Sequence, residues 1–403
     1  MKILVVDDEV HIRKLTCTIL KKSGYEVIEA SSGVEALAKL SFDSEIKFVI
    51  SDWVMSNING LELCRKIREM FNERYIYIIL LTSKTEKFEL VEGMNAGADD
   101  FIVKPFNVEE LKVRIRAGER ILNLQIELSE KTQKIERNYE QISNDLKYAH
   151  KLQKSLLPSK TNKITFNNTN ALINKINHDW LYIPSYFLSG DTFNIFRLDN
   201  ENIAFYHLDV SGHGIPSSFL SASLNRVLLP SQNSFIKRST DIYPFYEIIN
   251  PSEIFKTLNE YFQQNNDDGY YFTISYFIVN LNTGKTVFSV AGHTKPIILR
   301  KSGVLEIIED IGSSIGLSDS PSYDENEIIL EAGDKIILYS AGITGCKNKN
   351  YESFSEERLT NILNDVIDLP LTEILENIES EVNKWNDKNN FDDDISLLAV
   401  EFE

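Results

Sequence analysis

In the first third of the chain, charged and hydroxyl side chains directly follow short apolar runs. Asp7 and Asp8 follow the first run, Asp52 the third, Thr82 the fourth and Lys104 the fifth. Three carboxylates held together repel one another unless a cation lies among them, and oxygen ligands of this kind favour a hard ion such as Mg²⁺. An aspartate at a strand end can also simply cap the next helix, but capping does not account for all five positions. The pattern therefore predicts an acidic pocket that binds a divalent cation.

Acidic residues also mark the last part of the chain. Asp191 ends the run Ser189-Gly190-Asp191, Asp209 precedes Val210-Ser211-Gly212-His213-Gly214, and Asp393 lies in Asp392-Asp393-Asp394 before the last apolar run. Carboxylates at converging strand ends suit a two-metal hydrolytic centre that acts on a phosphate. Aspartates beside glycine are also ordinary turn residues, and spacing alone leaves these two interpretations level.

The first set of acids needs a scaffold, which residues 1–120 provide. Short buried-strand runs alternate there with amphipathic helical patterns, and this predicts a doubly wound α/β fold with a parallel sheet. We expect the strands at residues 3–6, 26–29, 48–51, 76–81 and 101–103. Ligands of such sheets bind at the carboxyl ends of the strands, where these acids lie.

Residues 121–158 form a middle segment with a seven-residue apolar repeat. The repeat consists of Ile121, Leu128, Ile135, Ile142, Ala149 and Leu156, and neither glycine nor proline occurs before Pro158. It predicts a coiled-coil linker helix, and we expect a parallel homodimer joined through residues 121–157. The alternative is a solvated helix lying against its own domain. Polar residues (Lys131, Asn138 and Asp145) interrupt the second apolar row, which favours a seam that changes register to transmit a signal.

Residues 159–403 show a different pattern. After a polar connection at 159–177, alternating apolar runs predict strands at 181–188, 203–210, 271–281, 285–290, 296–300, 327–330, 335–339 and 395–402. Helical patterns fall at 215–229, 251–264, 355–366 and 371–386. Short turns between the strand runs indicate antiparallel pairing, so we expect two sheets with helices outside, an α+β four-layer sandwich. The expected domains are residues 1–120, the linker 121–158 and residues 159–403.

Length and composition limit the possible functions. The 403 residues, 42% of them hydrophobic, exceed one ordinary domain and can form sizeable cores. The formal net charge of −18 argues against nucleic acid or an anionic membrane as a partner. No stretch approaches the apolar length of a membrane span, and the start turns acidic at Asp7, unlike a secretory signal. Three scattered cysteines (Cys17, Cys64 and Cys346) fit neither a disulfide framework nor a zinc site. We therefore expect a cytoplasmic protein.

Residues 1 to about 120 closely resemble the receiver domain of two-component response regulators. The resemblance implies that Asp52 accepts a phosphoryl group from a sensor histidine kinase, that Lys104 contacts a phosphate oxygen and that Thr82 donates its hydroxyl to the phosphate. The implied Mg²⁺ ligands are Asp7, Asp8, Asp52 and the carbonyl of Val54. Phe101 stands at the aromatic switch position of the family. One departure is Ser56, because the family usually has proline there.

Two further motifs, Ala291-Gly292-His293 and Ile315-Gly316-Leu317, follow the acids in order. Roughly residues 149–403 thereby resemble the metal-dependent, phosphatase 2C-like Ser/Thr phosphatases, in the bacterial branch of sporulation and stress-response phosphatases. The implied ligands of Mg²⁺ or Mn²⁺ are Asp191, Asp209, the carbonyl of Val210 and Asp393. The implied substrate is a phosphoserine protein such as an anti-sigma-factor antagonist. Residues 149–158, with Gln153, resemble the family's opening segment, a helix thought to control the metal site.

The departures from this second family bear on catalysis. The family has an aspartate between the hydroxyl residue and the glycine of Ser340-Ala341-Gly342, and the methyl group of Ala341 cannot bind a metal. Gly345 and Asn194 also stand where the family usually has acids. Asp392 and Asp394 should point away from the side of Asp393, because side chains alternate along a strand.

Two hypotheses follow. In the first, phosphorylation of Asp52 switches an active phosphatase. In the second, the output is a catalytically impaired pseudophosphatase that binds its partner in a phosphorylation-dependent way.

Other features have plainer interpretations. His213 and His293 lie in glycine turns, where we expect structural roles, and the remaining histidines (His11, His150, His178 and His207) should be ordinary surface or core residues. Residues 230–250 interrupt the phosphatase-like pattern. We expect a packed flap there, with partner contact as the alternative.

Overall fold

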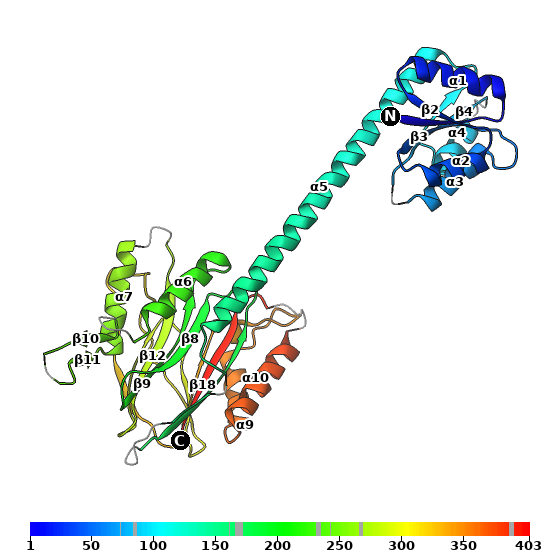
Figure 1. The fold of residues 1–403 in the computed structure, drawn as a ribbon. Helices are drawn as coiled ribbons and strands as arrows, with labels where there is room; N and C mark the ends of the chain where they lie inside the picture. Colours follow the sequence, from blue (N-terminus) through cyan, green and yellow to red (C-terminus); the bar gives the residue numbers. More distant parts are fainter. Residues whose placement is uncertain are drawn as a thin grey trace. The chain divides into compact units, whose positions relative to one another are not determined.

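The structure, a computed structural model, describes residues 1–72, 74–83, 87–160, 162–165, 172–230, 235–241, 243–265, 269–386 and 391–403. The chain divides into two compact units, Met1–Gln141 and Ile142–Glu403. The long helix α5 (Val108–Ser155; Figure 1) has residues in both units. Within the described ranges, we find no helix with both the length and the apolar character needed to cross a membrane.

The first unit is built on a parallel sheet in the order β2-β1-β3-β4-β5. Its strands are β1 (Lys2–Val6), β2 (Glu26–Ala30), β3 (Ile46–Asp52), β4 (Tyr77–Thr82) and β5 (Asp100–Val103). The helices are α1 (Val10–Lys22), α2 (Gly33–Phe42), α3 (Gly60–Met70), α4 (Lys87–Asn95) and the first part of α5. This arrangement confirms the predicted doubly wound α/β fold.

Both faces of this sheet are covered. Successive side chains of a strand point to opposite faces, and in β1 Leu4 and Val6 belong to one core cluster while Ile3 and Val5 belong to the other. All of β4 is buried. Continuous apolar runs of this kind are typical of parallel strands with helices on both sides, which explains why these strands are easily recognised in the sequence.

Helix α5 packs on the sheet through its first turns and then exposes its apolar repeat. Gly118 belongs to the packed part, because a Cβ there would lie 2.5 Å from Phe48 and 2.6 Å from Tyr77. Beyond it, Leu128 is 60% exposed and Ile135 is 68% exposed. The linker is therefore helical as predicted, and its pairing with a second helix stays a prediction.

The second unit contains two antiparallel sheets, in the orders β16-β13-β12-β9-β8 and β15-β14-β17-β18-β7-β6. The first sheet consists of β8 (Asp191–Arg197), β9 (Asn202–Val210), β12 (Phe272–Asn280), β13 (Lys285–Ala291) and β16 (Asn326–Ile329). The second consists of β6 (Asn162–Thr165), β7 (Lys175–Ile183), β14 (Ile297–Leu299), β15 (Leu305–Ile307), β17 (Lys335–Tyr339) and β18 (Ile395–Phe402). The helices are α6 (Ile215–Val227), α7 (Pro251–Asn265), α8 (Ala341–Gly345), α9 (Glu356–Asp365) and α10 (Leu371–Trp385).

Three core clusters stack these elements into four layers. One cluster fills the space between the two sheets, with Phe193 and Phe277 from one sheet and Leu398 from the other. A second lies between the first sheet and α6 and α7, and a third between the second sheet and α9 and α10. Figure 1 shows these two helix pairs on opposite sides of the strands. The predicted four-layer sandwich is confirmed.

The structure corrects several element boundaries. The strand expected at 181–188 is wrong, because β7 begins at Lys175 and ends at Ile183, and Asp191 begins a separate strand, β8. The expected loop at 159–177 contains β6, although residues 161 and 166–171 lie outside the described ones. The expected flap at 230–250 contains a short hairpin, β10 (Lys237–Ser239) and β11 (Tyr246–Ile248), with 231–234 and 242 outside the described residues. Its tip exposes Tyr243 and Phe245.

Candidate functional site

The acids of the first unit gather at one edge of its parallel sheet. Asp7 follows β1 and is fully buried, and Asp52 ends β3, the neighbouring strand. Lys104, after β5, places its Nζ 2.7 Å from Asp52 Oδ1 and 3.2 Å from Asp7 Oδ2. The sheet positions all three because parallel strands end at the same edge.

This edge also meets the requirements of a hard cation. Among the residues that the structure describes, Asp7, Asp8 and Asp52 are the only group of three or more potential ligand side chains whose ligand atoms all lie within 4.8 Å of one another. Burial raises the pKa of Asp52 and the charge of Asp7 raises it further, while Lys104 lowers it. A divalent cation would stabilise the ionised carboxylates, so the donor set fits Mg²⁺.

The loop after Asp52 is tied to the same cluster. The backbone N–H of Ser56 donates to Asp8 Oδ2 at 2.9 Å. A proline at this position would lack that donor, so Ser56 adds a bond that orients Asp8. Val54 is 62% exposed in this loop, and the buried Thr82 accepts the backbone N–H of Lys104 at 2.6 Å through its carbonyl. Phe101, at the predicted switch position, is half-buried.

In the second unit, Asp191 and Asp209 stand opposite each other on adjacent strands. Asp191 begins β8 and is paired in register with Asp209 near the end of β9. Burial raises the pKa of Asp209 to about 7, with the charge of Asp393 adding to the effect and a hydrogen bond from Asp191 opposing it. Burial and the charge of Asp209 also raise the pKa of Asp191 well above its ordinary value. Two facing buried carboxylates of this kind fit a divalent cation between them.

Asp393 lies beside the position of the missing family aspartate. A Cβ on Gly342 would fall 2.0 Å from the carbonyl O of Asp394 and 3.4 Å from the carbonyl C of Asp393, so the start of α8 abuts this stretch of backbone. Ser340 Oγ fixes the same contact by donating to Asp394 O at 2.9 Å. Ala341, the next residue, is exposed. A second ion at Asp393 would therefore have a methyl group where the family has a carboxylate.

Neither neighbouring acid replaces the missing ligand. The carboxylate of Asp394 accepts hydrogen bonds from Ser185 N at 2.7 Å, Ser185 Oγ at 3.0 Å and Gly190 N at 2.8 Å. These hydrogen bonds hold the turn before β8, and the expectation that the Asp394 side chain points away from the side of Asp393 stays a prediction. Asp392 is exposed.

Asn194 faces away from the acids. Asp191 and Asn194 are three residues apart on β8, so their side chains point to opposite faces of the strand. Asn194 Nδ2 donates to Asn225 Oδ1 in α6 at 3.3 Å. An acid at position 194 would therefore face α6 and not the pair Asp191 and Asp209.

Sequence reasoning missed a set of buried polar residues behind Asp191. Ser396 Oγ donates to Asp191 Oδ2 at 2.5 Å, and His207 Nε2 lies 2.8 Å from Ser396 Oγ. His207 Nδ1 in turn lies 2.8 Å from His293 Nε2. His207 is two residues before Asp209 on β9 and shares its face, a signal that could have been found in the sequence. Ser396 could not, because it comes from the opposite sheet.

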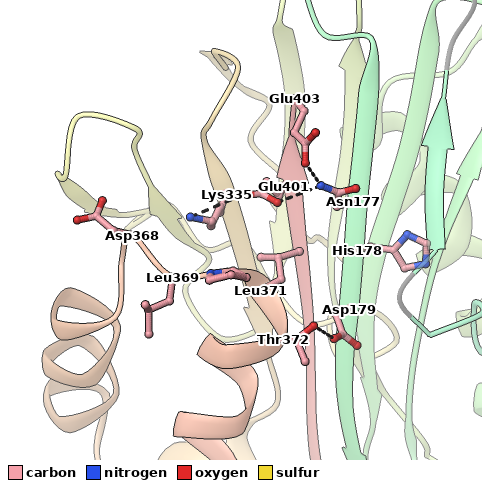
Figure 2. A pocket seen from close by; sticks show the side chains of 11 residues that line it. Asn177, His178, Asp179, Lys335, Asp368, Leu369, Leu371, Thr372, Glu401 and Glu403 are labelled. Carbon is pink, nitrogen blue, oxygen red and sulfur yellow. Dashed lines mark hydrogen bonds and ion pairs between the residues drawn. The ribbon is translucent and has the colours of Figure 1, made fainter.

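A separate hollow lies on the far side of the second sheet from the first. Figure 2 shows this cavity of about 450 Å³, lined by β7, β17, β18 and the connection between α9 and α10. Two of its polar side chains have hydrogen-bond partners: Thr372 Oγ1 donates to Asp179 Oδ2 at 3.0 Å, and Lys335 Nζ donates to the carbonyl of Ile367 at 2.9 Å. The acids Asp191, Asp209 and Asp393 are not among the residues that line it. These bonds stabilise the packing of α10 on the sheet.

Two family models match the chain. One, described as Stage II sporulation protein E (SpoIIE), matches residues 199–403, and the other, described as Response regulator receiver domain, matches residues 3–116. The solved SiaA-PP2C domain of Pseudomonas aeruginosa aligns with a TM-score of 0.52 and 17% identity, over 66% of this chain and 98% of that domain. At this level of identity, the likeness concerns the fold alone.

The relatives found by sequence match the first unit. The transcriptional regulatory protein ResD of Bacillus subtilis is 42% identical over 116 residues, which are 29% of this chain and 47% of ResD. The chemotaxis protein CheY1 of Helicobacter pylori is 40% identical over 116 residues, which are 28% of this chain and 94% of CheY1. The chain thus covers less than half of ResD and nearly all of CheY1.

Proposed function

Because the chain belongs to the stage II sporulation protein E family and also contains a response regulator receiver domain, we propose that phosphorylation of Asp52 controls its phosphatase 2C-like output domain. The output acts on a phosphoserine protein such as an anti-sigma-factor antagonist. The observation that carries this proposal is the facing pair Asp191 and Asp209, in one chain with the receiver acids. With its free, buried cysteines, the chain works in a reducing cytoplasm.

Asp52 accepts the phosphoryl group from a phosphohistidine of a sensor kinase. A carboxylate oxygen of Asp52 forms the new bond to phosphorus as the bond from phosphorus to the histidine nitrogen breaks. Lys104 Nζ, 2.7 Å from Asp52 Oδ1, contacts a phosphate oxygen of the product, and Thr82 donates its hydroxyl to it. Mg²⁺ held by Asp7, Asp8, Asp52 and the carbonyl of Val54 would neutralise charge on the transferred group.

Gln153 links helix α5 to the acids of the output domain. Its Nε2 donates to the carbonyl of Ser189 at 2.6 Å, and Ser189 N donates to Gln153 Oε1 at 3.1 Å. Ser189 Oγ accepts the backbone N–H of Asp191 at 2.9 Å. A rotation or shift of α5 would therefore pull on the turn that positions Asp191. We propose that this is how the state of Asp52 reaches the phosphatase-like domain.

The homodimer is the second part of the coupling. The exposed repeat of α5, with Ile135 68% exposed and Ile142 59% exposed, supports a parallel pair of helices through residues 121–157. When two helices are packed in register, a small movement at the receiver rotates or shifts both helices together. A single helix that is exposed to solvent has no partner to hold it, so the same movement would not reach the output domain.

In the output domain, Asp191, Asp209, Asp393 and the carbonyl of Val210 would hold Mg²⁺ or Mn²⁺. Bound there, such ions position water and stabilise the charge on a phosphate undergoing hydrolysis. Asp191 and Asp209 are already opposed by the strand register.

The test is hydrolysis of a phosphoserine peptide by the full chain with Mn²⁺, with and without a small-molecule phosphodonor. We expect turnover that changes with the phosphodonor, disappears in Asp209→Asn and no longer responds in Asp52→Asn. Turnover of equal size in wild type and Asp209→Asn would mean that the acid pair does not carry the reaction.

A second candidate is favoured by Ala341, which leaves one metal position short of a carboxylate. In this second candidate, the output domain is a pseudophosphatase that binds its phosphoprotein partner without hydrolysing it. Phosphorylation of Asp52 controls this binding. The same assay separates the two candidates, because Mn²⁺-dependent turnover abolished by Asp209→Asn excludes the second.

A further inference from the structure

We propose that the carboxylate of Asp191 is oriented by a one-directional hydrogen-bond chain that runs from Thr273 through His293, His207 and Ser396. The inference rests on the proposed function, in which Asp191 binds a metal ion. It assigns positioning roles to two histidines and two hydroxyl residues, none of which would touch the ion.

The chain is continuous and lies in the core. Thr273 Oγ1 is 2.7 Å from His293 Nδ1, and the His293 Nε2 to His207 Nδ1 distance is 2.8 Å. His207 Nε2 is 2.8 Å from Ser396 Oγ, which is 2.5 Å from Asp191 Oδ2. His207 and Ser396 are fully buried, and His293 is 4% exposed. All four links are within hydrogen-bonding distance.

The direction of the chain follows from its end at Asp191. With a divalent cation bound, the carboxylate of Asp191 is ionised and can only accept hydrogen bonds, so the hydroxyl of Ser396 donates its single proton to Asp191. Ser396 Oγ must then accept, which places a proton on His207 Nε2. The two ring nitrogens of the fully buried His207 face a hydroxyl and another imidazole, and not a carboxylate. Such a ring is neutral because no opposite charge compensates its burial, so with its proton on Nε2 its Nδ1 is an acceptor.

The same reasoning fixes the second ring. His293 donates from Nε2 to His207 Nδ1, and burial lowers the pKa of His293 to about 3, so it too is neutral. Its Nδ1 accepts the hydroxyl proton of Thr273 at 2.7 Å, because the other acceptor near that hydroxyl, the carbonyl of Asp209, lies farther away at 3.5 Å. Both rings therefore carry their proton on Nε2, and every donor in the chain points toward Asp191. Hydrogen bonds aligned in this way polarise one another.

The chain also ties the two sheets together at the metal end of the sandwich. Thr273 and His207 lie on β12 and β9 of one sheet, whereas Ser396 lies on β18 of the other. The ring of Phe193 stacks on His207, with centroids 5.8 Å apart and planes at 14°, which limits rotation of the imidazole. The carboxylate of Asp191 is thus oriented relative to both sheets.

Groups that orient a metal ligand typically change metal affinity by roughly 10- to 100-fold when they are removed. The test therefore measures Mn²⁺ affinity by calorimetry in the full chain carrying Asp8→Asn, which removes the receiver site from the titration. We expect Ser396→Ala to weaken Mn²⁺ binding about tenfold. Ser289→Ala is the matched control. Ser289 lies on β13 and is fully buried, and its Oγ donates to the carbonyl of Asp324 at 2.8 Å, so its loss also removes one buried hydrogen bond.

Ser289→Ala should destabilise the fold to a similar extent and leave Mn²⁺ affinity unchanged. An equal loss of affinity in both serine variants would overturn the proposal, since it would then reflect general loosening of the core. No Mn²⁺ binding by the parent chain would instead mean that the metal centre of the proposed function is wrong.

Nitrogen-15 spectra of the histidine rings, recorded with Mg²⁺, read the chain directly. We expect His207 and His293 as neutral Nε2–H tautomers, with a hydrogen-bonded ring proton on each. Ser396→Ala should shift the ring proton of His207 and leave that of His293 in place. An Nδ1–H tautomer at His207 in the presence of Mg²⁺ contradicts the proposed direction.

Discussion

Gly342 packs against the backbone carbonyl of Asp394 so closely that a Cβ at position 342 would lie 2.0 Å from that oxygen. Only glycine permits this approach, which holds the start of α8 against the backbone of Asp393 and Asp394, just before β18. The side chain of Ala341 consequently projects from the segment next to Asp393, with an exposed methyl group. The backbone thus keeps position 341 next to Asp393, but the residue there has no carboxylate to bind a metal ion.

Ala341→Asp should therefore raise Mn²⁺-dependent hydrolysis of a phosphoserine peptide. The new carboxylate would stand beside Asp393 and complete the second metal position. We expect kcat/KM to rise by at least about tenfold, roughly 1.4 kcal/mol of transition-state stabilisation. The gain should vanish in the double variant with Asp209→Asn.

Asn350→Asp is the comparison for this gain. Asn350 lies in the turn that follows α8 and is exposed, so the substitution adds the same charge at a position with no assigned role. A rise in activity as large as that of Ala341→Asp would show that added charge, and not the specific ligand position, is responsible.

Gln153→Ala should uncouple the output domain from the receiver. It removes both hydrogen bonds to Ser189, so movement of α5 no longer reaches the turn before Asp191. We expect the phosphodonor to stop changing the output activity. The free energy of unfolding should fall by about 1–3 kcal/mol, because buried backbone groups lose their partners. Steady-state assays with and without phosphodonor, together with urea unfolding, measure the two effects.

Gln141→Ala on the same helix is the control for Gln153→Ala. Gln141 is exposed, and its loss should leave both the response and the stability unchanged. Gln153→Glu sharpens the test, because it keeps the size of the side chain but replaces the donor to the Ser189 carbonyl with an oxygen. A full phosphodonor response in Gln153→Glu would rule out this route of coupling.

The sequence predicts the receiver sheet well because of how parallel strands are buried. Runs such as that of β4, buried throughout, are almost wholly apolar, and their carboxyl ends meet at one edge. The sequence alone therefore predicts that Asp7, Asp52 and Lys104 lie close together. The structure places Lys104 within hydrogen-bonding distance of both aspartates.

The output sheets are harder to predict because buried polar residues resemble a loop. The sequence predicts a start of β7 that is too far along the chain, because Asn177, His178 and Asp179 are polar and resemble loop residues. In the structure, His178 and Asp179 are almost fully buried. Tertiary partners compensate their burial: Thr372 Oγ1 donates to Asp179, and His178 Nε2 lies 3.0 Å from the carbonyl of Ser159. These partners are distant in sequence, so no local pattern shows them.

The hydrogen bonds of Asp394 could not be predicted from the sequence for the same reason. Alternation of side chains predicts that Asp394 leaves the side of Asp393, but only the structure shows which groups its carboxylate meets. The amide of Gly190, more than two hundred residues earlier, donates to it at 2.8 Å. Hydrogen bonds between residues of two sheets depend on the order of the strands in each sheet. The apolar periodicity of a single strand does not predict that order.

Glu35 should stabilise the receiver in a pH-dependent way. Its carboxylate accepts hydrogen bonds from Ser31 N and Ser31 Oγ, both at 2.7 Å, and pairs with Lys39 at 2.6 Å. These partners, Lys39 first, lower the pKa of Glu35 from 4.5 to about 2. A carboxyl with a lowered folded pKa adds stability above its unfolded pKa and loses it as the pH falls through the folded value. The contribution should be complete above about pH 4.5 and absent near pH 2.

Glu35→Gln should therefore destabilise the receiver at pH 7 and less so at pH 3. The side chain is 40% exposed, so solvent screening limits the loss at pH 7 to about 0.5 kcal/mol. Urea unfolding of both proteins at the two pH values measures it. A difference that grows on acidification would have the wrong sign for this mechanism.

Ile135→Asp should separate the proposed dimer into single chains. Ile135 belongs to the seven-residue repeat of α5 and is 68% exposed, and a charge buried in a helix-to-helix seam is strongly unfavourable. Light scattering at micromolar concentration should give twice the mass of one chain for the wild type and the mass of one chain for the variant. Gln133→Asp adds the same charge to an exposed position two residues away, which in a helix faces another direction, and should leave the dimer intact. A wild-type chain that is already single at this concentration would remove the dimer from the mechanism, and with it the seam that relays the state of Asp52.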